Sequence, residues 1–141
     1  MSDCVFYDIV KGKVPASIVY ADDKVMAFMD TRPVNPGHVL IIPKAHASQL
    51  SELDEETGGH IFKIAMHIDE ALRRSGSRCE GVTLLLADGE AAFQEIFHVH
   101  LHVIPRFRGD SFGIRFGRDY GREPNRKELA TVAGKIKVAL S

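Results

Sequence analysis

Residues 96 to 105 read IFHVHLHVIP, a stretch in which histidines alternate with apolar residues. An alternation with a period of two is typical of a β-strand that packs one face on a hydrophobic core. We therefore predict a strand over residues 96–104. Its core-facing set comprises Val99, Leu101 and Val103, which fixes the register. The opposite face then carries three histidines in a row: His98, His100 and His102.

Three imidazoles on one face need an explanation, because each ring forgoes apolar packing and neighbouring imidazolium ions repel one another. At least one ring should stay neutral, and a neutral imidazole is both a metal ligand and a nucleophile. Two hypotheses follow. The three rings hold a divalent metal, as in three-histidine hydrolytic sites, or the middle ring, that of His100, attacks an electrophile covalently. The strand by itself leaves both open.

The composition is that of an ordinary globular chain. It has 141 residues, 45% of them hydrophobic, and a net charge of −1. This argues against disorder and gives no overall attraction to nucleic acid or to an anionic membrane. The sequence contains neither an apolar run of membrane-spanning length nor a signal-peptide pattern, and its two cysteines do not suggest a disulfide framework. We expect one domain over residues 1–141 and a cytoplasmic location.

The charge is unevenly distributed along the chain. Residues 1–103 carry 9 basic and 15 acidic side chains, a balance of −6, whereas residues 104–141 carry 9 basic and 4 acidic ones, a balance of +5. On charge alone this segment is interpreted as a solvated loop and helix end. Its place directly after the histidine strand adds a second hypothesis, contact with a multiply anionic ligand. As a hypothesis, Arg106 and Arg108 hold the anionic leaving part of such a ligand.

The remaining periodicities predict an α+β domain. Helices are expected over residues 3–11, from after Ser51 to about Arg74, and after Asn125, where Asn125 and Glu128 form a capping-box pattern. Strands are expected over four further segments: 17–20, 24–29, 38–42 and 82–86. Strands gathered around one long helix, with a C-terminal helix, favour an antiparallel sheet covered on one side.

The wider pattern QEIFHVHLHV, residues 94–103, closely resembles the signature of the histidine triad family. The likeness extends to the Pro36-Gly37-His38 segment and the apolar residues after it, to residues 6–16, and to Asp88-Gly89. The resemblance implies a HIT-like fold over the whole chain, in the branch of bacterial histidine triad nucleotide-binding proteins. It also implies a purine-nucleotide hydrolase that acts on the α-phosphorus.

The resemblance assigns roles to the residues around the phosphate. His100 would be the nucleophile, forming a nucleotidyl-histidine intermediate. His98 would orient it through a hydrogen bond from the far ring nitrogen of His100 to the backbone carbonyl of residue 98. His102 and His38 would contact the phosphate and balance its charge. Gln94 would donate a hydrogen bond to the phosphate or the bridging oxygen.

The nucleoside end is assigned in the same way. Phe6, Ile9 and Phe28 would form a flat apolar slot for adenine, and Asp30 would accept hydrogen bonds from the ribose hydroxyls. Glu95 stands where many relatives have serine or threonine, and we treat it as a neighbour of the nucleotide with an open role.

Two positions depart from the pattern of relatives. Some bacterial members bind zinc through two cysteines and two histidines. Here Cys4, His46 and His98 match, but Tyr7 replaces the second cysteine, so we expect at most weak zinc binding and assign no metal or other cofactor. Phe93 occupies a position that is usually glycine, and we expect its side chain to narrow the mouth of the phosphate site.

The sequence thus predicts an enzyme that cleaves adenosine 5′-monophosphate from an amine or phosphate leaving group. A metal-dependent phosphohydrolase and a nucleotide-binding module with little turnover are the alternatives. The expected partners are a small nucleotide and a second copy of the chain, with neither nucleic acid nor membrane. His60 and His67 are interpreted as surface or dimer-rim residues, since their spacing of seven does not suit a metal pair on a helix.

Overall fold

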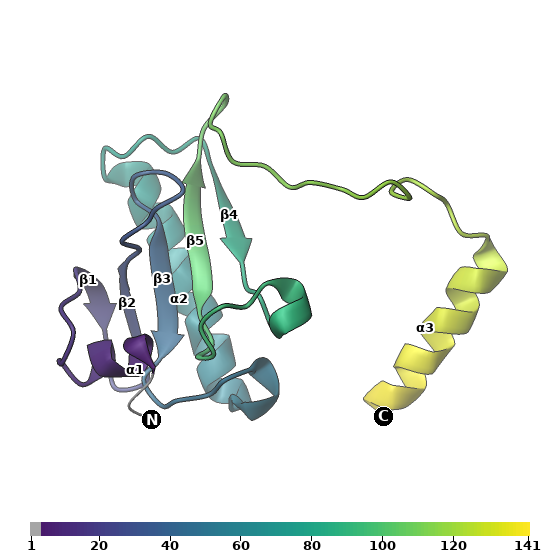
Figure 1. The fold of residues 1–141 in the computed structure, drawn as a ribbon, viewed down its shortest axis with the longest axis horizontal. Coiled ribbons are helices and arrows are strands. Elements are labelled where there is room, and N and C mark those ends of the chain that lie inside the picture. Colours follow the sequence, from purple (N-terminus) through teal and green to yellow (C-terminus); the bar gives the residue numbers. More distant parts are fainter. Residues whose placement is uncertain (1–3) are drawn as a thin grey trace. The chain divides into compact units, whose positions relative to one another are not determined.

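The computed structural model describes residues 4–141 and contains two compact units, one reaching to Ser111 and one formed by Phe112–Ser141. The first unit holds a five-stranded antiparallel sheet in the order β1-β2-β3-β5-β4 (Figure 1). The strands are β1 (Ile18–Ala21), β2 (Val25–Met29), β3 (Val39–Pro43), β4 (Gly81–Leu85) and β5 (Leu101–Arg106). The predicted α+β class is confirmed, and one domain over 1–141 stays a prediction.

The long helix α2 (Glu55–Arg74) covers one face of the sheet (Figure 1). The carboxylate of Asp54 caps its first turn by accepting a hydrogen bond from the Thr57 backbone amide at 2.8 Å. Its apolar stripe packs on the inward side chains of β2, β3 and β5, and the stripe consists of Ile61, Ile64, Ala65, Ile68 and Leu72. Leu101 and Val103 belong to this core, as the alternation predicts.

The opposite face of the sheet is also partly covered, so the prediction of one covered side is incomplete. Helix α1 (Val5–Val10) buries Phe6 and Ile9 against Met26, Phe28, Leu40 and Ile42. The reason lies in β2 and β3, which carry apolar side chains at almost every position and therefore need cover on both faces. The predicted helix over 3–11 is shorter in the structure, and residue 3 lies outside the described residues.

The histidine strand starts later than predicted. Strand β5 begins at Leu101, and residues 96–100 precede it in an irregular segment that bends at residues 96–98. The Val99 backbone amide donates a hydrogen bond to the Ala47 carbonyl at 2.8 Å, outside the sheet ladder. His98 and Val99 are both buried, so alternation does not separate a core side from an open side here. The segment is enclosed instead, because the connection between β3 and α2 lies against it.

Two short 3₁₀ turns complete the first unit, η1 (Leu50–Glu52) and η2 (Glu90–Ala92). The second unit contains helix α3 (Arg126–Leu140), which begins with the predicted capping box: Asn125 accepts from the Glu128 amide at 2.8 Å, and Glu128 accepts from the Asn125 amide at 3.0 Å. Among the residues that the structure describes, none of the helices is long and apolar enough to cross a membrane.

Candidate active site

A cleft of about 830 Å³ opens on the face of the sheet that carries α1. This volume suits a ligand of nucleotide size. Seven of the predicted site residues line it: Phe6, Ile9, Phe28, Asp30, Glu95, His100 and His102. The other three, His38, Gln94 and His98, are buried outside the cleft lining. The predicted residues therefore divide into seven that can contact a ligand in the cleft and three that are buried in the surrounding protein.

His100 is held so that one of its ring nitrogens is free for chemistry. Its Nδ1 lies 2.8 Å from the backbone carbonyl of His98, as the resemblance implies. A carbonyl only accepts, so Nδ1 carries the proton and the neutral ring keeps a lone pair on Nε2. The ring of Phe6 stands edge-on beside the imidazole, with 5.0 Å between the ring centroids. His100 thus presents an unprotonated nitrogen in a largely apolar surrounding.

His38 and His102 form a directed pair. The Val34 backbone amide donates a hydrogen bond to Nδ1 of His38 at 3.0 Å, which places the proton of the neutral His38 ring on Nε2. That Nε2 lies 2.9 Å from Nδ1 of His102 and donates to it. The neutral His102 ring then carries its own proton on Nε2, so a ring that lines the cleft is a hydrogen-bond donor without being charged.

The electrostatics favour neutral imidazoles throughout the site. Burial lowers the pKa of His38, His98 and His100 below the ordinary histidine value. Burial also lowers the pKa of His102 to about 4, and the neighbouring His100 and His38 add to this shift. All four rings are therefore neutral near pH 7, and their donor and acceptor properties depend on tautomers rather than on charge.

The three triad histidines do not share one metal position. Nε2 of His98 donates to the Pro43 carbonyl at 2.7 Å, and its Nδ1 faces the Cys4 sulfur at 3.4 Å. His102, by contrast, is engaged with His38. This geometry does not support the alternative in which three histidines of one strand hold a catalytic ion. The physical reason is that the rings have different partners: His98 meets Pro43 and Cys4, His100 meets the His98 carbonyl, and His102 meets His38.

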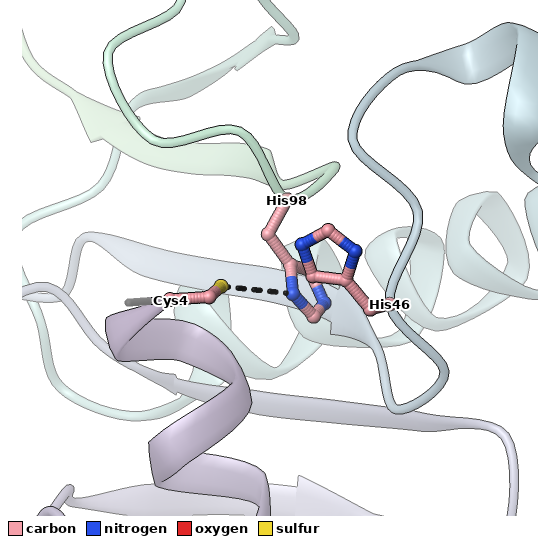
Figure 2. Close-up of side chains that lie close together, drawn as sticks. All are labelled: Cys4, His46 and His98. Carbon is pink, nitrogen blue, oxygen red and sulfur yellow. Dashed lines mark hydrogen bonds between the residues drawn. The ribbon is translucent and has the colours of Figure 1, made fainter. Parts of the chain in front are cut away.

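A different group gathers around His98. Ligand atoms of Cys4, His46 and His98 all lie within 4.8 Å of one another (Figure 2). The donor set fits zinc, because His98 turns the lone pair of Nδ1 inward while its Nε2–H is held by a backbone carbonyl. Three protein ligands leave the fourth position to water. The expectation of no metal is therefore not confirmed. The three remaining ligand atoms lie close enough together to share one ion, although Tyr7 stands in place of the second cysteine.

A second acidic and imidazole group, Asp30 with His38 and His102, is also compact. It suits a cation less well. To bind a metal through Nε2, the neutral His38 ring must carry its proton on Nδ1, and that proton would face the Val34 amide hydrogen. The observed hydrogen bond to His102 uses the same Nε2. This group is better described as a hydrogen-bonded network.

The nucleoside end of the cleft has the expected character. Phe6 and Phe28 meet edge to face with centroids 5.5 Å apart, and Ile9 packs in the same cluster. Asp30 follows β2 directly; one of its carboxylate oxygens accepts from the Arg32 amide at 2.9 Å, and the other lies 3.5 Å from Nε2 of His38. The two aromatic rings form one apolar wall, and Asp30 provides an acceptor beside it.

Gln94 differs from its predicted role in this conformation. Its carbonyl oxygen accepts from the Gly89 amide at 2.7 Å, and its amide nitrogen donates to the carbonyls of Ser48 and Ile96. These bonds tie η2 to the segment that follows β3. The side chain is buried and satisfied by backbone groups, so a direct bond from Gln94 to a phosphate stays a prediction.

Glu95 and Phe93 stand at the rim. Both line the cleft and both are exposed, which leaves the role of Glu95 open. Phe93 adopts φ 68° and ψ 28°, the left-handed conformation that glycine takes freely, and its side chain is 87% exposed. A side chain in this region costs about 1–2 kcal/mol. The departure from glycine is therefore a strained one, and the narrowing of the mouth stays a prediction.

Two sequence interpretations change once contacts are known. Arg106 forms a two-point ion pair with Asp110, with nitrogen–oxygen distances of 2.6 and 2.8 Å, so its charge is engaged within the protein. His60 lies 2.6 Å from Asp22 and joins α2 to the β1–β2 turn, whereas His67 is exposed as expected. Backbone groups were the main omission of the sequence analysis: the Val34 amide and the Pro43 carbonyl orient His38 and His98.

Comparisons with known proteins agree with this fold and site. The family model described as the HIT domain matches residues 11–109. An uncharacterized HIT-like protein of Borreliella burgdorferi is 40% identical over 132 residues, which cover 92% of this chain and 95% of that protein. The crystal structure of a HIT family protein from Bacillus anthracis superposes with a TM-score of 0.89 at 35% identity, covering 99% of this chain and 98% of that one.

The chain therefore belongs to the HIT family, whose members bind nucleotides and are generally nucleotide hydrolases or transferases. A zinc-bound histidine triad family protein from Mycobacterium smegmatis has a TM-score of 0.76 at 37% identity and covers 98% of both chains. The adenylylsulfatase HINT3 of Arabidopsis thaliana is 37% identical over 110 residues, which are 77% of this chain and 55% of that protein.

Proposed function

We propose that this chain hydrolyses adenosine 5′-monophosphate linkages through a covalent nucleotidyl-histidine intermediate on His100. The carrying observation is the 2.8 Å hydrogen bond from Nδ1 of His100 to the His98 carbonyl, which leaves the Nε2 lone pair at the cleft. A neutral imidazole is a good nucleophile toward phosphorus and also a good leaving group in the second step. The name of the plant relative, an adenylylsulfatase, supports an adenylyl group as the part transferred.

The reaction has two displacements. Nε2 of His100 attacks the α-phosphorus, and the bond from phosphorus to the amine nitrogen or phosphate oxygen breaks. The leaving group takes the bonding pair and gains a proton from solvent. Water then attacks the same phosphorus, the bond to Nε2 breaks, and the nucleoside monophosphate leaves while the proton of the water is released. The His98 carbonyl, which keeps Nδ1–H bound, balances the positive charge on the ring in the intermediate.

His102 and His38 act on the phosphate in this proposal. The Nε2–H of His102 donates to a non-bridging oxygen of the phosphate and stabilises the charge that develops there. His38 acts through His102, since its own Nε2–H is directed at that ring. Phe6, Ile9 and Phe28 hold the base, and Asp30 accepts from the ribose hydroxyls.

We propose that this chemistry needs no cofactor. The zinc-bound relative and the donor set support a zinc ion at Cys4, His46 and His98, where it would cross-link α1 to the segment before β5. Such an ion would fix the position of His98 and leave the ring of His100 unligated. Its contribution would be to stability, with the lone pair on Nε2 of His100 unchanged.

We also propose a homodimer and a cytoplasmic location. Strand β4 pairs with β5 on one side, and in the described part of the chain no strand pairs with its other edge. Leu84 and Leu85 on that strand are exposed. An unpaired edge with apolar side chains is stabilised by pairing with a second copy. Sedimentation equilibrium of the chain and of a Leu84→Lys variant tests this, with a monomeric variant expected.

The central experiment tests for the adduct. The protein is mixed with an adenosine phosphoramidate, quenched in alkali and digested, and the peptide that contains His100 is examined by mass spectrometry. We expect the added mass of an adenylyl group on His100, and loss of turnover by at least a factor of about 1,000 in His100→Asn. His67→Gln is the control, since His67 is exposed on α2.

The outcomes separate the alternatives. Nucleotide binding without turnover or adduct supports a binding module. Turnover that disappears on exhaustive chelation, without an adduct, supports metal-dependent hydrolysis. Near-normal kcat in His100→Asn removes the nucleophile assignment.

A further inference from the structure

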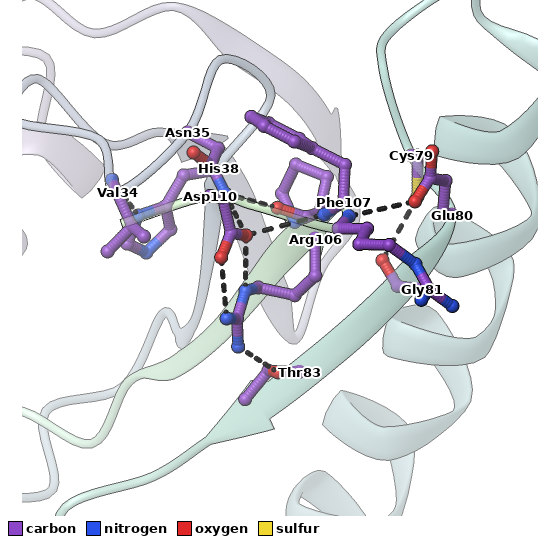
Figure 3. A network of polar contacts seen from close by, with 12 residues as sticks. Val34, Asn35, His38, Cys79, Glu80, Gly81, Thr83, Arg106, Phe107 and Asp110 are labelled. Atoms are coloured by element: carbon purple, nitrogen blue, oxygen red, sulfur yellow. Dashed lines mark hydrogen bonds and ion pairs between the residues drawn. The ribbon is translucent and has the colours of Figure 1, made fainter. Parts of the chain in front are cut away.

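The loop between β2 and β3 is anchored to the far end of β5 by one side chain (Figure 3). Asn35 is 7% exposed, and its amide nitrogen donates to the Pro105 carbonyl and to the Asp110 carboxylate, both at 2.9 Å. Pro36 and Gly37 follow, and Gly37 has φ 101°. A Cβ at Gly37 would approach Leu72 and Pro105 to 3.2 Å, so the loop is closely packed where it enters β3.

Asp110 makes this anchor directional. Its side chain is 3% exposed and accepts hydrogen bonds from Nε and Nη2 of Arg106. The Nη1 of the same arginine donates a hydrogen bond to the Thr83 hydroxyl on β4 at 3.1 Å. The hydrogen bond with Arg106 keeps the pKa of Asp110 well below its ordinary value, so the carboxylate is ionised and only accepts. A carboxylate and a backbone carbonyl both require donors, and the Asn35 amide therefore has one orientation.

The anchored loop holds His38 at two points. The backbone carbonyl of Asn35 accepts a hydrogen bond from the backbone amide of His38 at 3.1 Å, and the Val34 backbone amide donates to Nδ1 of the His38 ring at 3.0 Å. The second bond keeps the proton off Nδ1 of His38, since a nitrogen that accepts cannot carry the proton. The Asp30 carboxylate oxygen 3.5 Å from Nε2 favours the same tautomer. The proton on Nε2 is then donated to Nδ1 of His102.

The opposite state would harm the site. If the Val34 amide moved away, the proton of His38 could occupy Nδ1, and Nε2 would accept from Nδ1–H of His102. His102 would then turn a lone pair toward the cleft, where it would repel phosphate oxygens. The chain of contacts thus selects between a donor and an acceptor at the same atom of His102.

We propose that Asn35, held by Asp110 and the Pro105 carbonyl, is a positioning residue that fixes His102 as an Nε2–H donor through Val34 and His38. The inference rests on the proposed function only for the use of that donor on a phosphate. The tautomer itself is a property of the free protein. Arg106 acts in the same device by orienting Asp110, which gives this arginine a role within the protein.

The test is direct observation of the tautomers. In protein labelled with ¹⁵N, long-range ¹H–¹⁵N correlation at mildly alkaline pH distinguishes a ring protonated on Nδ1 from one protonated on Nε2. We expect Nε2–H for His38 and His102 and Nδ1–H for His100. In Asn35→Ala we expect His102 to populate Nδ1–H while His100 is unchanged, together with a fall in kcat of roughly tenfold and a smaller change in KM.

Asp54→Ala is the control for a merely structural effect. It removes the helix cap of α2, which costs about 1 kcal/mol, without touching the loop. Its histidine tautomers should match those of the wild type. Asp110→Asn keeps the shape of the side chain and is the variant to measure if Asn35→Ala does not fold. It should shift the tautomer of His102 toward Nδ1–H, as Asn35→Ala does.

A folded Asn35→Ala or Asp110→Asn protein with wild-type tautomers at His38 and His102 overturns the inference. If the wild type hydrolyses no adenylyl substrate but the tautomers shift as expected, the proposed function fails and the positioning role stands. If turnover occurs and the tautomers do not respond, the reverse holds.

Discussion

The ring of His100 and the backbone carbonyl of His98 are joined by a hydrogen bond of 2.8 Å. The first histidine of the triad therefore orients the second through its main chain, while its own side chain is engaged elsewhere. The His98 ring is fully buried and donates to the Pro43 carbonyl. This separates what the residue does for the chemistry from what it does for the fold.

We accordingly predict that His98→Ala lowers stability more than it alters the nucleophile. The substitution removes a buried ring, leaves the Pro43 carbonyl unpaired and keeps the backbone carbonyl of residue 98. The free energy of unfolding should fall by about 2–4 kcal/mol, measured by urea denaturation. The folded variant should still form the adduct on His100. A variant of wild-type stability that forms no adduct would contradict this division.

The pH dependence of activity should have its acid limb below the ordinary histidine pKa. The nucleophile must be neutral, and burial lowers the pKa of His100. Activity is therefore complete above this pKa and lost as the pH falls through it. The measurement is kcat/KM for an adenosine phosphoramidate between about pH 4 and pH 8, and an acid limb centred at or above about 6.5 is the opposite result.

Stability should also fall on acidification. His102 has a pKa of about 4 in the folded protein and about 6.5 in the unfolded chain, so between these values the unfolded state binds more protons. The stability is full above about pH 6.5 and declines toward pH 4. From His102 alone the loss between pH 7 and pH 5 is about 2 kcal/mol or less. Urea unfolding at both values measures it, and His102→Gln should have a flatter dependence.

Asp30→Asn should weaken nucleotide binding in a way that depends on the sugar. The carboxylate lies at the nucleoside end of the cleft and accepts from ribose hydroxyls in the proposed complex. Loss of a hydrogen bond to a charged group costs about 1.5–3 kcal/mol, or roughly a tenfold to hundredfold rise in KM. With a 2′,3′-dideoxy substrate the wild type and the variant should have similar KM values. Equal losses on both substrates would remove the ribose assignment.

Metal removal should affect stability and spare catalysis. If zinc binds Cys4, His46 and His98, a chelator should lower the melting temperature, and Cys4→Ser should abolish this response. Turnover of the chelated protein should persist at a temperature where it remains folded, because His100 is outside this group. A chelated protein that is folded and inactive would contradict the proposal that no cofactor takes part in the reaction.

Much of the fold could be predicted because its signals are local. The apolar periodicity of α2, the Asn125–Glu128 capping box and the punctuation around β1 to β3 depend on neighbouring residues alone. The predicted start of the histidine strand was wrong because that start depends on distant residues. Strand β5 needs β3 and β4 as partners, and their ladders reach no further back than Leu101. The position of residues 96–100 depends instead on the hydrogen bond from the Val99 backbone amide to the Ala47 carbonyl, which joins segments that are distant in the sequence.

The amino-acid sequence by itself determined the family, the apolar face of β5 and the candidate residues of the cleft, because these follow from residue types and their spacing along the chain. For His98, His38 and His102 the structure decided which ring nitrogen is offered, whereas the family resemblance already implied it for His100. His98, His100 and His38 each precede an apolar residue, but each meets a different backbone group, at Pro43, at His98 and at Val34. A tautomer depends on the hydrogen-bond partner. The Val34 amide and the His98 carbonyl lie four and two residues from the rings they meet, whereas the Pro43 carbonyl is 55 residues from His98 and reaches its ring only by the folding of the chain.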